Sequence, residues 1–131
     1  MTVITRSVVS SGAIAVAALF AGPAQAHHGW SWAEEAQSEL AGTVQRVQMA
    51  PPHPTLEVKT AEGAVWRVEL GNPSQTERSG FSEASAKPGD AITATGNRDR
   101  DASQLRMKAV QIKVGGKTYD LYPERIQKPK N

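Results

Sequence analysis

The chain has 131 residues, no cysteine, and 15 basic against 13 acidic residues, for a formal charge of +2. Without cysteine, structural disulfides and a thioether-linked lipid anchor are excluded, so any fold must be held by its core alone. The near balance of charge gives no indication of a polyanionic partner.

The first 26 residues have the pattern of a secretory signal peptide. Arg6 precedes an uncharged apolar run over residues 7–22, and residues 24–26 (Ala-Gln-Ala) supply the small side chains of a cleavage site. The run is shorter than the roughly 20 residues that span a bilayer. We therefore expect cleavage after Ala26, a periplasmic or secreted protein with no membrane span after processing, and a mature chain that begins at His27.

Short alternating runs separated by turns begin at Leu40, which is typical of a small all-β barrel or sandwich. The first run, over residues 40–49, changes phase at Arg46, which predicts a bulge or bend. The proline-rich residues 50–54 must end that strand, because proline donates no hydrogen bond to a sheet. Further strands are expected at residues 55–60, 64–70, 91–96, 105–114 and 117–122.

A short helix is predicted between the third and fourth strands. Asn72 suits an N-cap, Pro73 suits the first helical position, and Gly80 suits the end of the helix. Three strands, a short helix and then two or three strands is the element order of the OB-fold. We therefore expect an all-β fold with one short helix, in an OB-fold-like barrel of five or six strands. A six-strand sandwich without the helix is the alternative.

This interpretation divides the chain into four parts. Residues 1–26 are the signal peptide and residues 27–39 an N-terminal extended segment. Residues 40–122 form the OB-like barrel, in which residues 97–101 are expected to be a charged loop, and residues 123–131 form a loose polar tail.

Several short motifs follow one another along the mature chain. They are Ala26-His27-His28, Gly42-Thr43-Val44, Pro51-Pro52-His53, Val65-Trp66-Arg67-Val68-Glu69, Asn72-Pro73 and Pro88-Gly89-Asp90. In this order and spacing the chain resembles a family of small bacterial periplasmic proteins classed as a domain of unknown function. In that family the third motif reads Asn-Pro-His, so Pro51 takes the place of the asparagine and no role of that side chain carries over. The resemblance implies a fold and a location but no activity.

All three histidines of the chain, His27, His28 and His53, lie near the start of the mature chain. An N-terminal histidine offers its α-amine and its imidazole as a chelating pair. A second imidazole, from His28 or His53, would complete the planar nitrogen set that Cu(II) prefers. Copper is therefore the hypothesised metal, since a closed zinc site would need four ligands. The alternative is that His27 and His28 are exposed and bind metal adventitiously, and that His53 only occupies a rigid loop.

Trp30 and Trp32 alternate as they would on an extended segment, and three interpretations are open. They could form an aromatic lid that docks the amino terminus on the barrel, a surface patch for a partner, or part of the core. With Trp66, they are the candidate partner-binding residues for a peptide, a glycan or a periplasmic protein. No hydrolase motif is present, so enzymatic activity is not expected. Acids in the charged loop and export argue against nucleic-acid binding, although OB barrels often bind oligonucleotides.

Overall fold

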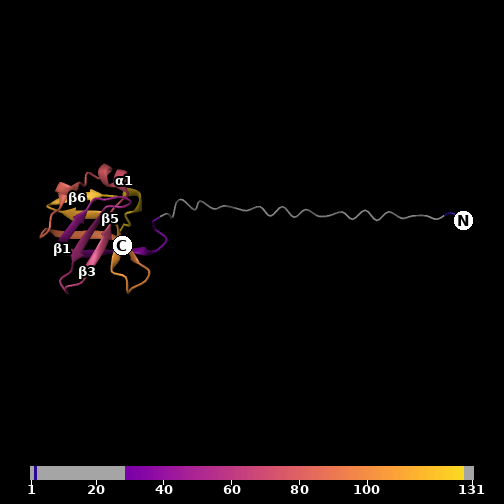
Figure 1. The fold of residues 1–131 in the computed structure, drawn as a ribbon, viewed down its shortest axis with the longest axis horizontal. Coiled ribbons are helices and arrows are strands. Elements are labelled where there is room, and N and C mark those ends of the chain that lie inside the picture. Colours follow the sequence, from indigo (N-terminus) through magenta and orange to yellow (C-terminus); the bar gives the residue numbers. More distant parts are fainter. Residues whose placement is uncertain (1, 3–28, 129–131) are drawn as a thin grey trace.

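The structure, a computed structural model, describes residue 2 and residues 29–128. The described residues form six strands, an α-helix and two short 3-10 helices: β1 (Ala33–Gln48), β2 (Thr55–Lys59), β3 (Val65–Glu69), α1 (Pro73–Arg78), η2 (Glu83–Ser85), β4 (Ala91–Asp99), β5 (Arg106–Val114), β6 (Lys117–Asp120) and η3 (Pro123–Arg125). The strand order is β3-β2-β1-β4-β5-β6, and a further β3–β5 pairing closes the barrel (Figure 1). Neighbours in that order are antiparallel, whereas the closing β3–β5 pair is parallel. The predicted OB-like barrel is confirmed, with six strands.

The long first strand serves two neighbours. β1 pairs with β4 from Ala33 to Thr43 and with β2 from Thr43 onward. Its register with β2 shifts between Val44 and Arg46, which confirms the predicted bend. A Cβ on Gly42 would lie 2.4 Å from the carbonyl oxygen of Lys59. Glycine is therefore required where β1 passes from one neighbour to the other.

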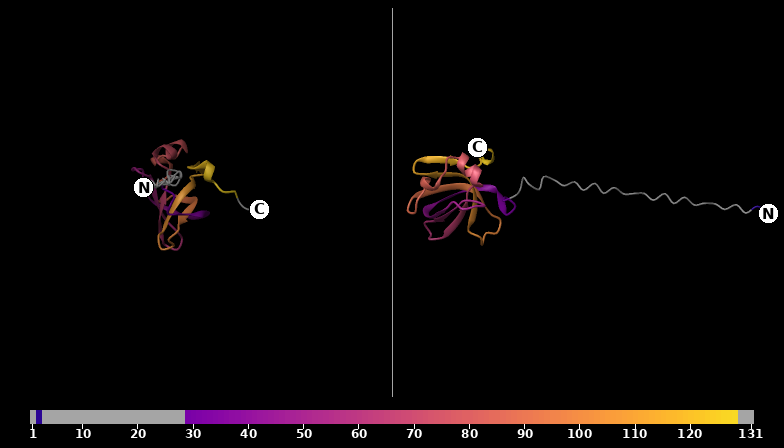
Figure 2. Two further views of the ribbon diagram at one scale, coloured as in Figure 1. Left: turned by 90° about the vertical axis from the view of Figure 1, so that its right-hand side faces the viewer. Right: turned by 45° about the horizontal axis from the view of Figure 1, so that its top comes forward.

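The core lies inside the barrel and consists mainly of alternate strand residues, each of which contributes roughly 1.5–3 kcal/mol by burial. Phe81, which follows α1, packs edge to face on Tyr119 of β6 with ring centroids 5.3 Å apart. Figure 2 shows α1 at the same end of the molecule as β6. The buried set is Leu40, Val44, Leu56, Val58, Val68, Leu70, Phe81, Ala86, Ile92, Ala94, Met107, Ala109, Val110, Ile112, Val114, Tyr119, Leu121 and Tyr122.

The short helix forms where the sequence predicts it. The Asn72 side chain accepts a hydrogen bond of 2.8 Å from the Gln75 N–H, and Pro73 takes the first helical position. The helix ends at Arg78, and Gly80 then adopts a φ of +86°. No helix among the residues that the structure describes has the length and apolarity needed to cross a membrane.

Two strands are longer than predicted. β1 begins at Ala33 rather than Leu40, and β4 continues to Asp99 through part of the expected charged loop. The reason is that the polar side chains of β4 find partners within the fold. The Asn97 Nδ2 donates to the carbonyl oxygens of Glu34 and Glu35, at 2.9 Å and 3.1 Å. These bonds hold the start of β1 against the end of β4.

The tail was predicted to be loose, but as far as Lys128 it is attached to β1. The Gln127 N–H donates to the Gln37 side chain at 3.0 Å, and the Gln37 N–H donates to the Gln127 side chain at 3.3 Å. The Gln127 Nε2 also donates to the Glu35 carbonyl oxygen at 2.8 Å. The prediction is therefore wrong for this stretch, because glutamine amides replace the backbone partners of a neighbouring strand.

Candidate functional site

The segment that precedes β1 docks on β5. Residues 29–32 form a turn rather than the predicted extended segment: Gly29 has a φ of +84°, and the Ala33 N–H donates to the Trp30 carbonyl oxygen at 3.0 Å. The two tryptophans nevertheless lie over two cations of β5 that are also two residues apart. The Trp30 ring centre is 5.6 Å from the Lys108 Nζ, and the Trp32 ring centre is 3.8 Å from the Arg106 guanidinium carbon.

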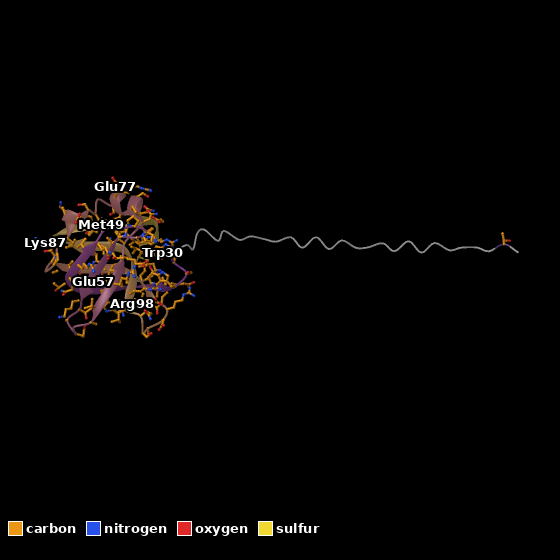
Figure 3. All side chains as sticks on the ribbon, viewed as in Figure 1. Trp30, Met49, Glu57, Glu77, Lys87 and Arg98 are labelled. Carbon is orange, nitrogen blue, oxygen red and sulfur yellow. The ribbon has the colours of Figure 1, made fainter. Side chains whose placement is uncertain are left out.

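Trp30 has contacts on several sides. Its ring meets Tyr122 edge to face with centroids 5.0 Å apart, and the Arg125 guanidinium carbon lies 4.2 Å from its centre. The side chain is half-buried and packs against the core. Figure 3 labels it on the side of the barrel where the described chain begins. Trp30 therefore fixes this segment to the barrel through residues near the other end of the chain.

Beneath this segment lies a buried lysine. Lys108 is 1% exposed and stands opposite Glu69 across the parallel β3–β5 pair. Its Nζ is 3.8 Å from the Glu69 Oε2 and has no hydrogen-bond partner within the described part of the chain. Burial lowers the pKa of Lys108 below its usual value, and the Glu69 charge opposes that shift.

His53, in the loop between β1 and β2, reaches the same place. A Cβ on Gly29 would lie 3.7 Å from the His53 Nε2 and 3.7 Å from the Lys108 Nζ. The His53 Nδ1 is buried and lacks a hydrogen-bond partner among residues 29–128. Burial, and then the Lys108 charge, lower the pKa of His53 below 6.5, against the opposing effects of Glu69 and the Gly71 backbone. The imidazole is therefore mostly neutral at pH 7, the form that binds metals.

The three predicted metal ligands are only partly placed by the structure. His27 and His28 lie outside the described residues, whereas His53 lies beside Gly29, the residue that follows them. Within residues 29–128 there is no group of three histidine, aspartate or glutamate side chains that could hold a metal ion. The barrel thus contributes one of the predicted ligands.

Sequence reasoning missed Glu69 and Lys108 as members of this site. A signal was present, because Lys108 interrupts the otherwise apolar stretch from Met107 to Val110, and Glu69 lies between Val68 and Leu70. Charged residues inside buried strand segments are rarely without a partner or a role.

The third tryptophan lies on a separate surface. Trp66 of β3 is half-buried, with the Arg98 guanidinium carbon 4.8 Å from its ring centre. The Arg98 Nε donates to the Ser38 Oγ at 2.9 Å. A hollow of about 510 Å³ adjoins the two side chains and is lined by Glu34, Ser38, Trp66, Arg98, Asp99, Ala102 and Gln104. Figure 3 labels Arg98 and Trp30 at different places on the barrel.

Comparison with known proteins identifies the fold and a family. Twenty-eight chains of solved structures are similar to this chain. One, from the crystal structure of the S. pombe Stn1-Ten1 complex, is 17% identical with a TM-score of 0.50, over 60% of this chain and 57% of that chain. The match thus spans little more than half of the Stn1-Ten1 chain, and at this identity the similarity concerns the OB-like fold alone.

No curated protein matches the sequence. The model of one family matches residues 15–108, which is more than half of the chain. The protein therefore belongs to DUF6152, a family of unknown function.

Proposed function

We propose that this protein is exported and that its processed amino terminus, together with the barrel, binds a copper ion. The ligands are the α-amine and imidazole of His27, with His28 and His53. The observation that supports this site most directly is the contact of Gly29 with the His53 Nε2, at 3.7 Å from its Cβ position. A histidine selected from the sequence for its donor chemistry thus lies where the amino-terminal segment meets the barrel.

Covalent geometry makes a shared site feasible. Consecutive Cα atoms are 3.8 Å apart, so His28 and His27 begin about one and two such steps from Gly29. Since Trp30 is fixed by Tyr122 and Arg125, this starting point is held on the barrel. The amine and imidazoles form the nitrogen-rich donor set that suits Cu(II).

The test compares two forms of the full mature protein that differ at the amino terminus. One begins at His27, and the other carries one extra alanine before it. We expect sub-micromolar Cu(II) binding by the first form and at least about tenfold weaker binding by the second, measured by competition with a chromogenic chelator, because the extra residue removes the amine from the chelate.

Three further measurements complete this experiment. His53→Ala should weaken binding by about as much, whereas Lys59→Ala, on exposed β2 surface, should leave it unchanged. Equal binding by the two amino termini, or weak binding by both, would contradict the proposal. Mass spectrometry of the exported protein should give His27 as its first residue, and another first residue would remove its amine from the site.

A second candidate function is a metal-free interaction module that binds a peptide or glycan on the barrel. The hollow beside Trp66, with its stacked Arg98, favours it, because half-buried aromatics next to hydrogen-bonding side chains recur in binding sites. A panel of glycans and peptides screened by tryptophan fluorescence tests this function. A ligand whose response is lost in Trp66→Ala and retained in Trp32→Ala would support it, and a panel without any response would oppose it.

A further inference from the structure

The side chain of Glu69 combines burial with long ion pairs. It is 10% exposed, its Oε1 lies 3.7 Å from the Arg67 Nη2, and its Oε2 lies 3.8 Å from the Lys108 Nζ. Both distances exceed that of a charge-assisted hydrogen bond, which is about 2.7–2.9 Å. Glu69 is thus a nearly buried carboxylate held by attraction at a distance, which leaves its oxygens available for a closer partner.

The same carboxylate belongs to the region where Gly29 meets His53. Lys108, its partner, is 3.7 Å from the Gly29 Cβ position, and so is the His53 Nε2. The Lys108 and His53 nitrogens are therefore no further apart than twice that distance. The Lys108 Nζ and the His53 Nδ1 are also the two buried side-chain atoms that lack a hydrogen bond in the described part of the chain. Unpaired buried polar atoms are costly, and two together indicate that a component of the site is missing.

We propose that Glu69 is a further ligand of the metal site and that Lys108 weakens metal binding by competing for its carboxylate. This inference rests on the proposed function. With the His27 amine and two imidazoles, Glu69 gives three nitrogens and one oxygen, which is a tetragonal set suited to Cu(II). It also supplies the negative charge that a divalent ion otherwise lacks in a site made of neutral nitrogens.

The role of Lys108 follows from its charge and its place. An ammonium group within a few ångströms of a divalent ion repels it, and burial weakens the screening of that repulsion by solvent. Lys108 also attracts the carboxylate that the ion would use. Glu69 and Lys108 are therefore expected to change metal affinity in opposite directions, although each is the other's partner.

Three variants of the mature full-length protein test this assignment. Glu69→Gln should weaken Cu(II) binding by about tenfold or more, and should shift the copper electron paramagnetic resonance spectrum because an oxygen ligand is lost. Lys108→Met, which preserves the length of the buried side chain, should tighten binding by about tenfold. Arg67→Gln is the matched control: it removes the other, 60% exposed partner of Glu69 and should change the affinity less than about twofold.

The outcomes separate this inference from the proposed function. If binding requires His53 and a free His27 but is unchanged in Glu69→Gln, the ligand assignment is wrong and the proposed site stands. If the parent protein binds Cu(II) only weakly, both fall. Weaker or equal binding by Lys108→Met would overturn the role of Lys108. Thermal unfolding of each variant verifies the fold, and Lys108→Gln takes the place of Lys108→Met if that variant does not fold.

Discussion

Replacing Trp30 by alanine should release the segment before β1 and lower the free energy of unfolding by about 2 kcal/mol. The lost contacts are the edge-to-face pair with Tyr122, at 5.0 Å, and the Arg125 guanidinium, at 4.2 Å. An aromatic pair contributes about 0.5–1.5 kcal/mol beyond its area, and an exposed cation–π contact about 0.5–1 kcal/mol. The sum stays below the 3–5 kcal/mol typical of a fully buried tryptophan, because Trp30 is only half-buried.

The control is Trp32→Ala, the same substitution two residues further along the same segment. Trp32 has a cation–π contact with Arg106, at 3.8 Å, but no recorded aromatic pair, so we expect a loss of about 0.5–1 kcal/mol. Urea unfolding followed by circular dichroism measures both variants. Labelling with an amine-selective reagent should also increase at Lys108 in Trp30→Ala, since the segment that covers it is released. A loss below about 0.5 kcal/mol for Trp30→Ala, or a larger loss for Trp32→Ala, would refute the anchoring role.

Three further predictions concern the barrel and its loops. Gly42→Ala places a Cβ 2.4 Å from the Lys59 carbonyl oxygen, so we expect a loss of about 3 kcal/mol or failure to fold, whereas Gly63→Ala, which meets open space, should cost only the strain of its positive φ; thermal unfolding compares them. Asn72→Ala removes the N-cap of α1 and should cost about 1 kcal/mol in urea unfolding. Because the folded pKa of His53 is below 6.5, the unfolded chain takes up this proton more readily, so the His53 contribution to stability should fall as the pH drops below that value. Urea midpoints at pH 7.5 and pH 5 should fall less in His53→Gln than in the parent, and an equal fall would contradict this.

Local patterns were sufficient to predict most of the barrel. Period-two alternation identified the strands, Asn72 and Pro73 identified the helix, and the phase change at Arg46 identified the bend in β1. The end of β4 was missed because Asn97 and Asp99 are polar residues, which indicate a loop when only their neighbours in sequence are considered. Their partners in the fold are the backbone of β1 and the Arg106 side chain.

The candidate site was less accessible to sequence reasoning because it depends on contacts between distant segments. Residue type alone selected His53, but its contact with Gly29 depends on Trp30 docking against Tyr122 and Arg125. The pairing of Glu69 with Lys108 depends on the parallel register that closes the barrel. No periodicity within either strand determines that register.

The contacts of Arg125 and Gln127 with the start of the described chain have a consequence for topology. Trp30 lies under Arg125, and Gln37 and Gln127 bond to each other, so the first and last described segments are neighbours. The polypeptide is thus almost a closed ring. A short linker could join residue 128 to residue 29, with new ends opened at the exposed turn of Gly63, as circular permutation requires. Such a permuted barrel would keep His53, Glu69 and Lys108 in their strands and loops while presenting no free amine beside them.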